Sequence, residues 1–168
     1  MKPTICFEMV YPGLKPEEKV ARIAGHGFRA VEFWGWRDKD IEAMAETAAK
    51  HGVSVTNFAA QRRGDLIDAR TQGTLMEELA SSLEAARTLG TKTMMVLTNE
   101  LGEGGVVVNS HPEIPNDEKR KNTVAALKQM LGAYPEDMKL VVEPLNTVLD
   151  HVGYFLPSVE TAREIIDE

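Results

Sequence analysis

A carboxylate directly follows a run of hydrophobic residues in the segment LVVEPLN. The residues from Leu140 to Val142 are typical of a buried strand, whereas Glu143 is charged. Pro144 cannot donate a hydrogen bond to a neighbouring strand, so the strand is expected to end at about Glu143. At the carboxyl end of a strand, Glu143 has two interpretations: it is a partner in a structural ion pair, or it is a catalytic group whose burial is offset by a cation and a substrate.

Two other predicted strands carry a carboxylate as well. Glu8 is the single charged residue in TICFEMV. In AVEFWGW, strand alternation places Glu32, Trp34 and Trp36 on one face. Taken alone, Glu8 or Glu32 is more often a salt-bridged structural residue, and Trp34 is equally a packing residue. If they converge with Glu143, they form an acidic pocket with aromatic walls, a setting suited to divalent cations or sugar hydroxyls.

The four histidines differ in how near they lie, along the sequence, to the carboxylates of the predicted pocket. His151 follows the strand of Glu143 in the segment DHVGYF, so it either orders this loop or belongs to the site. His111 lies in a long loop and is expected to be solvated. His26 and His51 each precede a helix-ending glycine, and we expect them to act as cations at helix C-termini.

Alternating helices and strands are predicted to position these side chains. A segment of helical period, a glycine and a short apolar strand recur along the chain. This order predicts a parallel sheet with helical crossovers, in which chemistry lies at the carboxyl ends of the strands. Long connections, as at 60–71 and 99–116, are usually functional or mobile. The expected strands are 4–10, 30–35, 53–59, 93–98 and 139–143, and the expected helices are 16–26, 40–51, 72–89, 117–132 and 158–167.

Composition limits the class of protein and its partners. The chain has 168 residues, enough for one domain, and a formal charge of −7, which argues against nucleic acid or an anionic membrane as the main partner. Cys6 is the single cysteine, so an internal disulfide is excluded. The sequence shows neither a signal peptide nor an apolar run of ~18 residues that would span a membrane. These features predict a cytoplasmic protein.

Two segments, AVEFWGWRDKDIEAM and VVEPLNTVLDHVGYFLPS, resemble the hydroxypyruvate isomerase-like branch of the xylose isomerase-type TIM barrels, a superfamily of sugar phosphate isomerases and epimerases. The likeness extends along essentially the whole chain. It implies that Glu143 is both a metal ligand and an acid/base catalyst. It also implies that Asn146 and His151 lie beside the substrate and that Trp36 covers the mouth. The implied cofactor is a divalent cation, Mg²⁺ or Mn²⁺, with Co²⁺ or Zn²⁺ as alternatives.

The resemblance also implies a fold and a reaction. Residues 1–168 would form the N-terminal portion of a single domain: a parallel (β/α) fold of the TIM-barrel type, with five βα units of an expected eight. The remaining metal ligands and a second catalytic glutamate would lie on strands six to eight. The implied reaction is an aldose–ketose isomerisation, most simply of hydroxypyruvate to tartronate semialdehyde, by carboxylate-mediated proton transfer through an enediolate.

Three alternatives to this function remain open. The first is a sugar 3-epimerase of the same fold. The second is an AP-endonuclease-type phosphodiesterase, which would need a basic face and several histidine ligands. The third is a truncated, non-catalytic half-barrel that acts as a binding or assembly module. Because five βα units leave strand edges and an apolar face open, we expect a homo-oligomer or a chain completed by strands six to eight.

Overall fold

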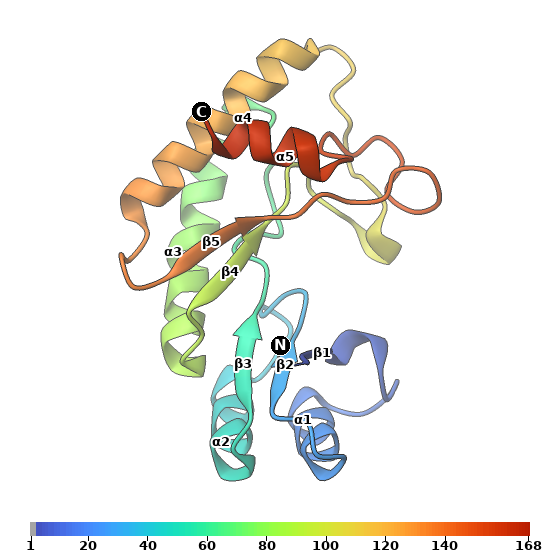
Figure 1. The fold of residues 1–168 in the computed structure, drawn as a ribbon, viewed down its shortest axis with the longest axis vertical. Helices are drawn as coiled ribbons and strands as arrows, with labels where there is room; N and C mark the ends of the chain where they lie inside the picture. The colour runs from blue at the N-terminus through green and yellow to red at the C-terminus, as the bar shows by residue number, and fades with distance from the viewer. Residues whose placement is uncertain (1–2) are drawn as a thin grey trace. The chain divides into compact units, whose positions relative to one another are not determined.

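The computed structural model describes residues 3–168, and five strands alternate with five α-helices along the chain (Figure 1). Each predicted strand and helix is present, although the strands are shorter than expected. The strands are β1 (Ile5–Cys6), β2 (Ala30–Glu32), β3 (Ser54–Asn57), β4 (Thr93–Val96) and β5 (Lys139–Val142). The helices are α1 (Pro16–Gly25), α2 (Ile41–His51), α3 (Gln72–Leu89), α4 (Asn116–Ala133) and α5 (Val159–Ile166).

The chain divides into two compact units. The first unit contains Met1–Ala60 and Ser81–Met94, and the second contains Gln61–Ala80 and Met95–Glu168. The strands form two sheets, one in the order β1-β2-β3 and one that pairs β4 with β5. Short 3₁₀ helices lie in the connections at Phe7–Met9, Ala69–Thr71 and Glu103–Gly105.

The first unit is built on a parallel three-stranded sheet. In its register, Cys6 lies beside Glu32 and Glu32 lies beside Asn57. A stack of three phenylalanines fills the core beside this sheet: the ring centroids of Phe7 and Phe33 are 5.2 Å apart, and those of Phe33 and Phe58 are 5.1 Å apart. All three side chains are buried.

Local capping explains where α2 begins and ends. The Asp40 side chain accepts a hydrogen bond from the backbone N–H of Ala43, which satisfies one of the free donors of the first turn. Gly52 follows the last residue with a φ of 62°, a left-handed conformation that glycine adopts at no steric cost. The glycine that marked this helix end in the sequence therefore has the expected role.

The first strand differs from its prediction. A strand was expected over 4–10, but β1 ends at Cys6 and the chain turns into the 3₁₀ helix Phe7–Met9, which contains Glu8. The physical reason is the packing of Phe7: its ring stacks on Phe33, and its carbonyl accepts a hydrogen bond of 3.1 Å from the buried Lys19 ammonium. Hydrophobic alternation does not reveal such a turn, because apolar residues continue through it.

β4 and β5 form the second sheet and run side by side in the same direction (Figure 1). β4 is the more buried of the two, with Val96 fully buried, whereas Val141 of β5 is 41% exposed. The connections after β4 and β5 contact each other. Gly153 approaches Ser110 so closely that an added Cβ would lie 3.1 Å from the serine Cβ.

Candidate functional site

Glu143 lies directly after the last residue of β5, as predicted from Pro144. Its backbone N–H donates a hydrogen bond of 3.2 Å to the carbonyl of Val96, the last residue of β4. The pairing of the two strands therefore continues through the nitrogen of Glu143 and stops before Pro144. The acidic side chain of Glu143 therefore belongs to the carboxyl end of the sheet, and the residue is half-buried.

A buried tyrosine holds the carbonyl of Glu143. The Tyr154 hydroxyl donates a hydrogen bond of 2.9 Å to this carbonyl and accepts one of 2.9 Å from the backbone N–H of Thr98. Tyr154 is 4% exposed, and burial raises the pKa of its hydroxyl to about 12. One side chain thus joins the backbone just beyond β4 to the backbone just beyond β5. The sequence motif contained Tyr154, but its spacing from Glu143 gave no sign of this contact.

Asn146 orders the turn that follows Glu143. Its Oδ1 accepts hydrogen bonds from the backbone N–H groups of Val148 and Leu149, at 2.9 and 3.3 Å. Its Nδ2 donates to the Asp150 carboxylate at 3.2 Å. These are the contacts of an asparagine that closes a local turn. The predicted contact of Asn146 with substrate stays a prediction.

His151 is held by the loop after β4. Its Nδ1 lies 2.6 Å from the carbonyl oxygen of Gly105, and its backbone N–H donates to the carbonyl of Asn146 at 3.0 Å. The ring is half-buried. His151 therefore does order this loop, one of its two sequence interpretations. Its predicted role beside the substrate stays open.

In the first unit, Glu8 forms an ion pair. Its Oε1 lies 2.9 Å from the ammonium of Lys39, whose side chain is only 5% exposed. This contact corresponds to the structural interpretation of Glu8. The same ammonium lies 5.6 Å from the centroid of the Phe33 ring, so Lys39 also covers the aromatic core.

Glu32 and the two tryptophans lie nearby in the same unit. Glu32 is half-buried at the end of β2 and adjacent in register to Cys6. Burial raises the pKa of the Cys6 thiol, and the charges of Glu32 and Glu8 raise it further. Trp34 is 48% exposed, whereas the neighbouring Phe33 is buried. The indole N–H of Trp36 donates a hydrogen bond of 2.8 Å to the Ser82 hydroxyl.

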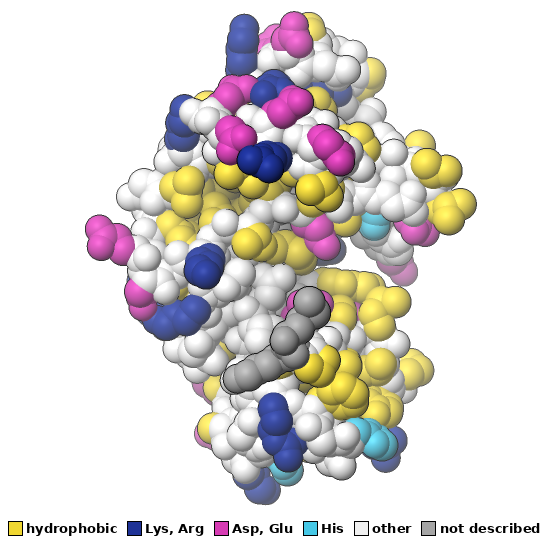
Figure 2. Space-filling view, in the orientation of Figure 1, with side chains coloured by type: hydrophobic (Ala, Val, Ile, Leu, Met, Phe, Trp, Pro, Cys, Tyr) yellow, Lys and Arg dark blue, Asp and Glu magenta, His cyan; other side chains and the backbone are white. Residues whose placement is uncertain are grey.

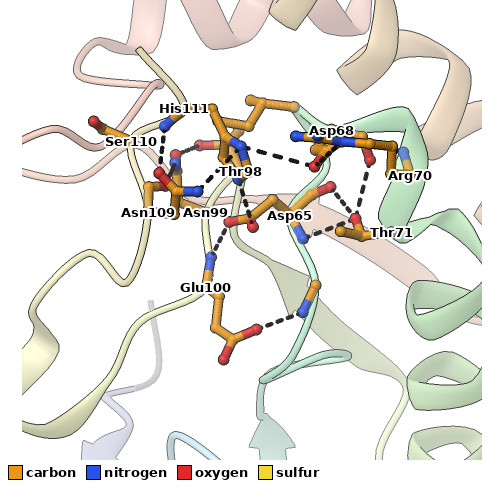
Figure 3. Close-up of polar contacts among 12 residues, drawn as sticks. Asp65, Asp68, Arg70, Thr71, Thr98, Asn99, Glu100, Asn109, Ser110 and His111 are labelled. Carbon is orange, nitrogen blue, oxygen red and sulfur yellow. Dashed lines mark hydrogen bonds and ion pairs between the residues drawn. The ribbon is translucent and has the colours of Figure 1, made fainter. Parts of the chain in front are cut away.

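A buried polar network joins the loops after β3 and β4 (Figure 3). At its centre, Asp65 Oδ2 lies 3.0 Å from His111 Nε2, and Asp65 Oδ1 accepts a hydrogen bond of 2.7 Å from the backbone N–H of Glu100. Thr71 Oγ1 donates to the Asp65 carbonyl at 2.7 Å. Both Asp65 and His111 are buried.

The expectation that His111 is solvated is therefore wrong. His111 is 5% exposed, because its loop folds back onto the preceding one and presents three carboxylates to the ring. Burial by itself lowers the pKa of His111, but hydrogen bonds to Asp65 and Glu113 outweigh it, so the pKa is raised. The hydrogen bond from Arg70 lowers the pKa of Asp68, the third carboxylate.

The structure thus brings the predicted residues together in two groups. Glu8, Glu32 and the tryptophans belong to the first unit, and Glu143, Asn146 and His151 belong to the second. Their convergence at one mouth stays a prediction. Across residues 3–168, no three His, Cys, Asp or Glu side chains are grouped so that they could hold a metal ion. Glu143 therefore remains a single candidate ligand, and the described residues do not fit a complete metal centre.

Comparison with models of protein families identifies the family of the chain. Residues 20–168 match the family model described as xylose isomerase-like TIM barrel. The chain belongs to this family. Its fold class, a parallel α/β fold of the TIM-barrel type with five βα units, is confirmed. No curated protein matched the chain.

Within residues 3–168, no helix has the length and apolar character needed to cross a membrane.

Solved structures with the same fold are longer than this chain. An AP endonuclease of family 2 from Brucella melitensis has a TM-score of 0.84 and 18% identity, covering 99% of this chain and 64% of its own. The 3-keto-D-glucoside 4-epimerase YcjR from E. coli has a TM-score of 0.73 and 20% identity, with the same coverage of 99% and 64%. The IOLI protein, solved with a zinc atom, has a TM-score of 0.71 and 19% identity, covering 99% and 58%. The chain spans less than two thirds of each.

Proposed function

We propose that this chain is part of an isomerase or epimerase that acts on a small hydroxy-carbonyl substrate, with Glu143 as a proton-transferring carboxylate. The observation that carries the proposal is the position of Glu143 at the carboxyl end of β5. Its backbone is fixed on both sides, by Val96 at the nitrogen and by Tyr154 at the carbonyl. A carboxylate in this position is half-buried and held on a rigid element. A group that removes a proton from a substrate must be held in a fixed position in this way.

The reaction requires a proton to leave one carbon next to a carbonyl and to return elsewhere. In the proposed step, the Glu143 carboxylate accepts this proton and then donates it back, which is typically worth ~10²–10⁴-fold in rate. A divalent cation, when bound, would polarise the oxygens of the substrate. We propose metal dependence because a protein of similar fold, IOLI, was solved with zinc. The candidates remain Mg²⁺ or Mn²⁺, with Co²⁺ or Zn²⁺ as alternatives.

The leading substrate pair is hydroxypyruvate and tartronate semialdehyde, proposed from the resemblance of the segments around Trp36 and Glu143. A sugar epimerase is the second candidate, favoured by the similarity in fold to YcjR. Both reactions begin when Glu143 removes a proton from a carbon next to the carbonyl. In isomerisation the proton returns to the neighbouring carbon, whereas in epimerisation a second acid/base group must deliver a proton to the opposite face of the same carbon. A phosphodiesterase acting on DNA is disfavoured by the formal charge of −7, because DNA binding depends on cationic contacts with phosphates.

The test uses the protein expressed from its complete native reading frame. Hydroxypyruvate and a panel of ketoses are incubated with it in D₂O and followed by NMR, with Mn²⁺ present and then with EDTA. We expect isomerised or epimerised product, with deuterium incorporated at the carbon next to the carbonyl and loss of turnover in EDTA. Absence of conversion and exchange across the panel would overturn the proposal, as would incision of abasic DNA as the only activity.

A further inference from the structure

We propose that the carbonyl of Gly105, in the turn Gly102–Gly105, positions His151, so that Nε2 of its ring accepts a hydrogen bond from a hydroxyl group of the substrate. The part about the substrate rests on the proposed function. The part about the ring rests on contacts in the second unit alone. The turn includes the 3₁₀ helix Glu103–Gly105, in the connection after β4.

The contact between His151 and Gly105 determines which ring nitrogen carries a proton. Nδ1 lies 2.6 Å from the Gly105 carbonyl oxygen. A carbonyl oxygen only accepts hydrogen bonds, so Nδ1 must be the donor. In the neutral ring the second nitrogen, Nε2, then has no proton and offers a lone pair. His151 is thus prepared to accept a hydrogen bond from a donor such as a sugar or hydroxy-acid hydroxyl.

The carbonyl that orients His151 belongs to a closed turn. The backbone N–H of Gly105 donates to the carbonyl of Gly102 at 3.1 Å, and the N–H of Gly102 donates to the carbonyl of Val106 at 2.8 Å. An antiparallel bridge between Leu101 and Val107 closes the base of the turn. These bonds fix the direction in which the Gly105 carbonyl points, so the turn acts as a rigid partner for the ring.

Glycine is required at position 105 for two reasons. Its φ is +79°, a conformation that other residues rarely adopt, and a Cβ built there would lie 2.7 Å from His151 Cε1 and 3.2 Å from Nδ1. Gly104 shares the first constraint but not the second: its φ is +67°, and no other heavy atom lies within 4 Å of its added Cβ. Alanine substitutions at the two neighbouring glycines therefore distinguish the effect of backbone strain from the effect of contact with the imidazole.

Hydrogen bonds also connect His151 to the backbone of Glu143. The carbonyl of His151 accepts from the backbone N–H of Tyr154 at 3.0 Å, and the Tyr154 hydroxyl donates to the carbonyl of Glu143. The histidine and the proposed catalytic residue are thus held by one hydrogen-bonded frame. A substrate hydroxyl bound at Nε2 would be fixed relative to the backbone that presents the Glu143 carboxylate.

The tautomer is tested by NMR on the 168-residue chain. Long-range ¹H–¹⁵N spectra at pH 8.5 assign the protonated nitrogen of His151 in the wild type, in Gly105→Ala and in Gly104→Ala. We expect the Nδ1–H form in the wild type and in Gly104→Ala, and loss of this form in Gly105→Ala. An Nε2–H ring in the wild type would overturn the proposal without any variant, as would an unchanged ring in a folded Gly105→Ala protein.

The contact with substrate is tested by steady-state kinetics on the protein from the complete reading frame. Gly105→Ala and His151→Phe should each raise KM about tenfold, the effect of losing one hydrogen bond, with a much smaller change in kcat. Gly104→Ala should leave KM unchanged. An unaltered KM in Gly105→Ala, with the tautomer shifted, would overturn the substrate contact. A wild type without isomerase or epimerase activity would instead refute the proposed function, and the tautomer experiment would still decide the role of the turn.

Discussion

At the scale of the residue, a single hydroxyl satisfies two backbone groups at the proposed catalytic carboxylate. The Tyr154 hydroxyl accepts a hydrogen bond from the Thr98 N–H and donates one to the Glu143 carbonyl. Buried backbone groups that lose their partner are costly, because water does not replace the lost bond. The position of Glu143 therefore depends on a side chain eleven residues further along the chain.

Replacing this hydroxyl should lower stability. Tyr154→Phe keeps the ring but leaves one buried donor and one acceptor unsatisfied, so we expect the free energy of unfolding to fall by ~1–3 kcal/mol. Urea denaturation followed by circular dichroism measures the change. Tyr11→Phe, at a half-buried tyrosine of the first unit, is the control and should change stability by less than ~0.5 kcal/mol. Equal changes in the free energy of unfolding for the two substitutions would show that the Tyr154 hydroxyl does not stabilise the fold.

The same tyrosine predicts an alkaline limit to stability. The folded pKa of about 12 lies above the reference value of 10.0, because burial disfavours the phenolate. The stabilisation is therefore complete below pH 10 and is lost as the pH rises towards 12. The difference in unfolding free energy between wild type and Tyr154→Phe should shrink across this range. A difference that stays constant from pH 9 to pH 11.5 would contradict the burial of the neutral hydroxyl.

At the scale of the element, local signals predicted the order of strands and helices. Gly52 ends α2 as a capping residue that acts on its own neighbours, so sequence spacing was sufficient to place this helix end. Pro144 likewise located the end of β5. The pairing of Asp65 with His111 joins two loops 46 residues apart, and no local pattern specifies it. The acidic segment DLIDAR was the available signal, but it became interpretable only when the fold brought the loops together.

The His111 network predicts a dependence of stability on pH. The ring is close to three carboxylates, those of Asp65, Asp68 and Glu113. Arg70 forms ion pairs with two of them, Asp68 and Glu113. Because the folded pKa of His111 is raised above 6.5, its stabilisation is complete below pH 6.5 and is lost as the pH rises through the folded value.

We expect the unfolding free energy of the wild type to decline above pH 6.5, and His111→Asn to lose this slope. His51→Gln, at an exposed histidine at the end of α2, is the control and should keep it. Urea denaturation at several pH values between 5 and 9 provides the measurement. A slope that persists in His111→Asn would assign the pH dependence to another group.

At the scale of the whole molecule, the chain presents apolar surface and strand edges that a closed barrel would cover. β1 lies at the end of the first sheet, and β5 is paired on one side in the second. Hydrophobic side chains reach the surface in several patches (Figure 2). The largest exposed fractions among them belong to Met9, Val148, Leu149, Val152 and Val159. Exposed apolar side chains and unpaired strand edges of this kind favour association.

We therefore predict that the 168-residue chain, taken alone, is not a catalytically competent monomer. Barrel closure fixes strand number and tilt together, and five βα units do not meet that condition. Size-exclusion chromatography with light scattering should show association, and an isomerase assay on the same sample should show little turnover. A stable monomer with full metal-dependent activity would contradict this prediction.

The role of Glu143 is the central claim, and Glu143→Gln tests it most directly because the substitution preserves side-chain volume and removes the charge. In the protein from the complete reading frame, with metal supplied, kcat should fall by at least ~10²-fold while the circular dichroism spectrum and unfolding midpoint remain close to the wild type. Glu136→Gln, at an exposed glutamate in the turn before β5, is the control and should retain wild-type kcat. Near-normal turnover in Glu143→Gln would contradict the account and would make Glu143 a structural residue.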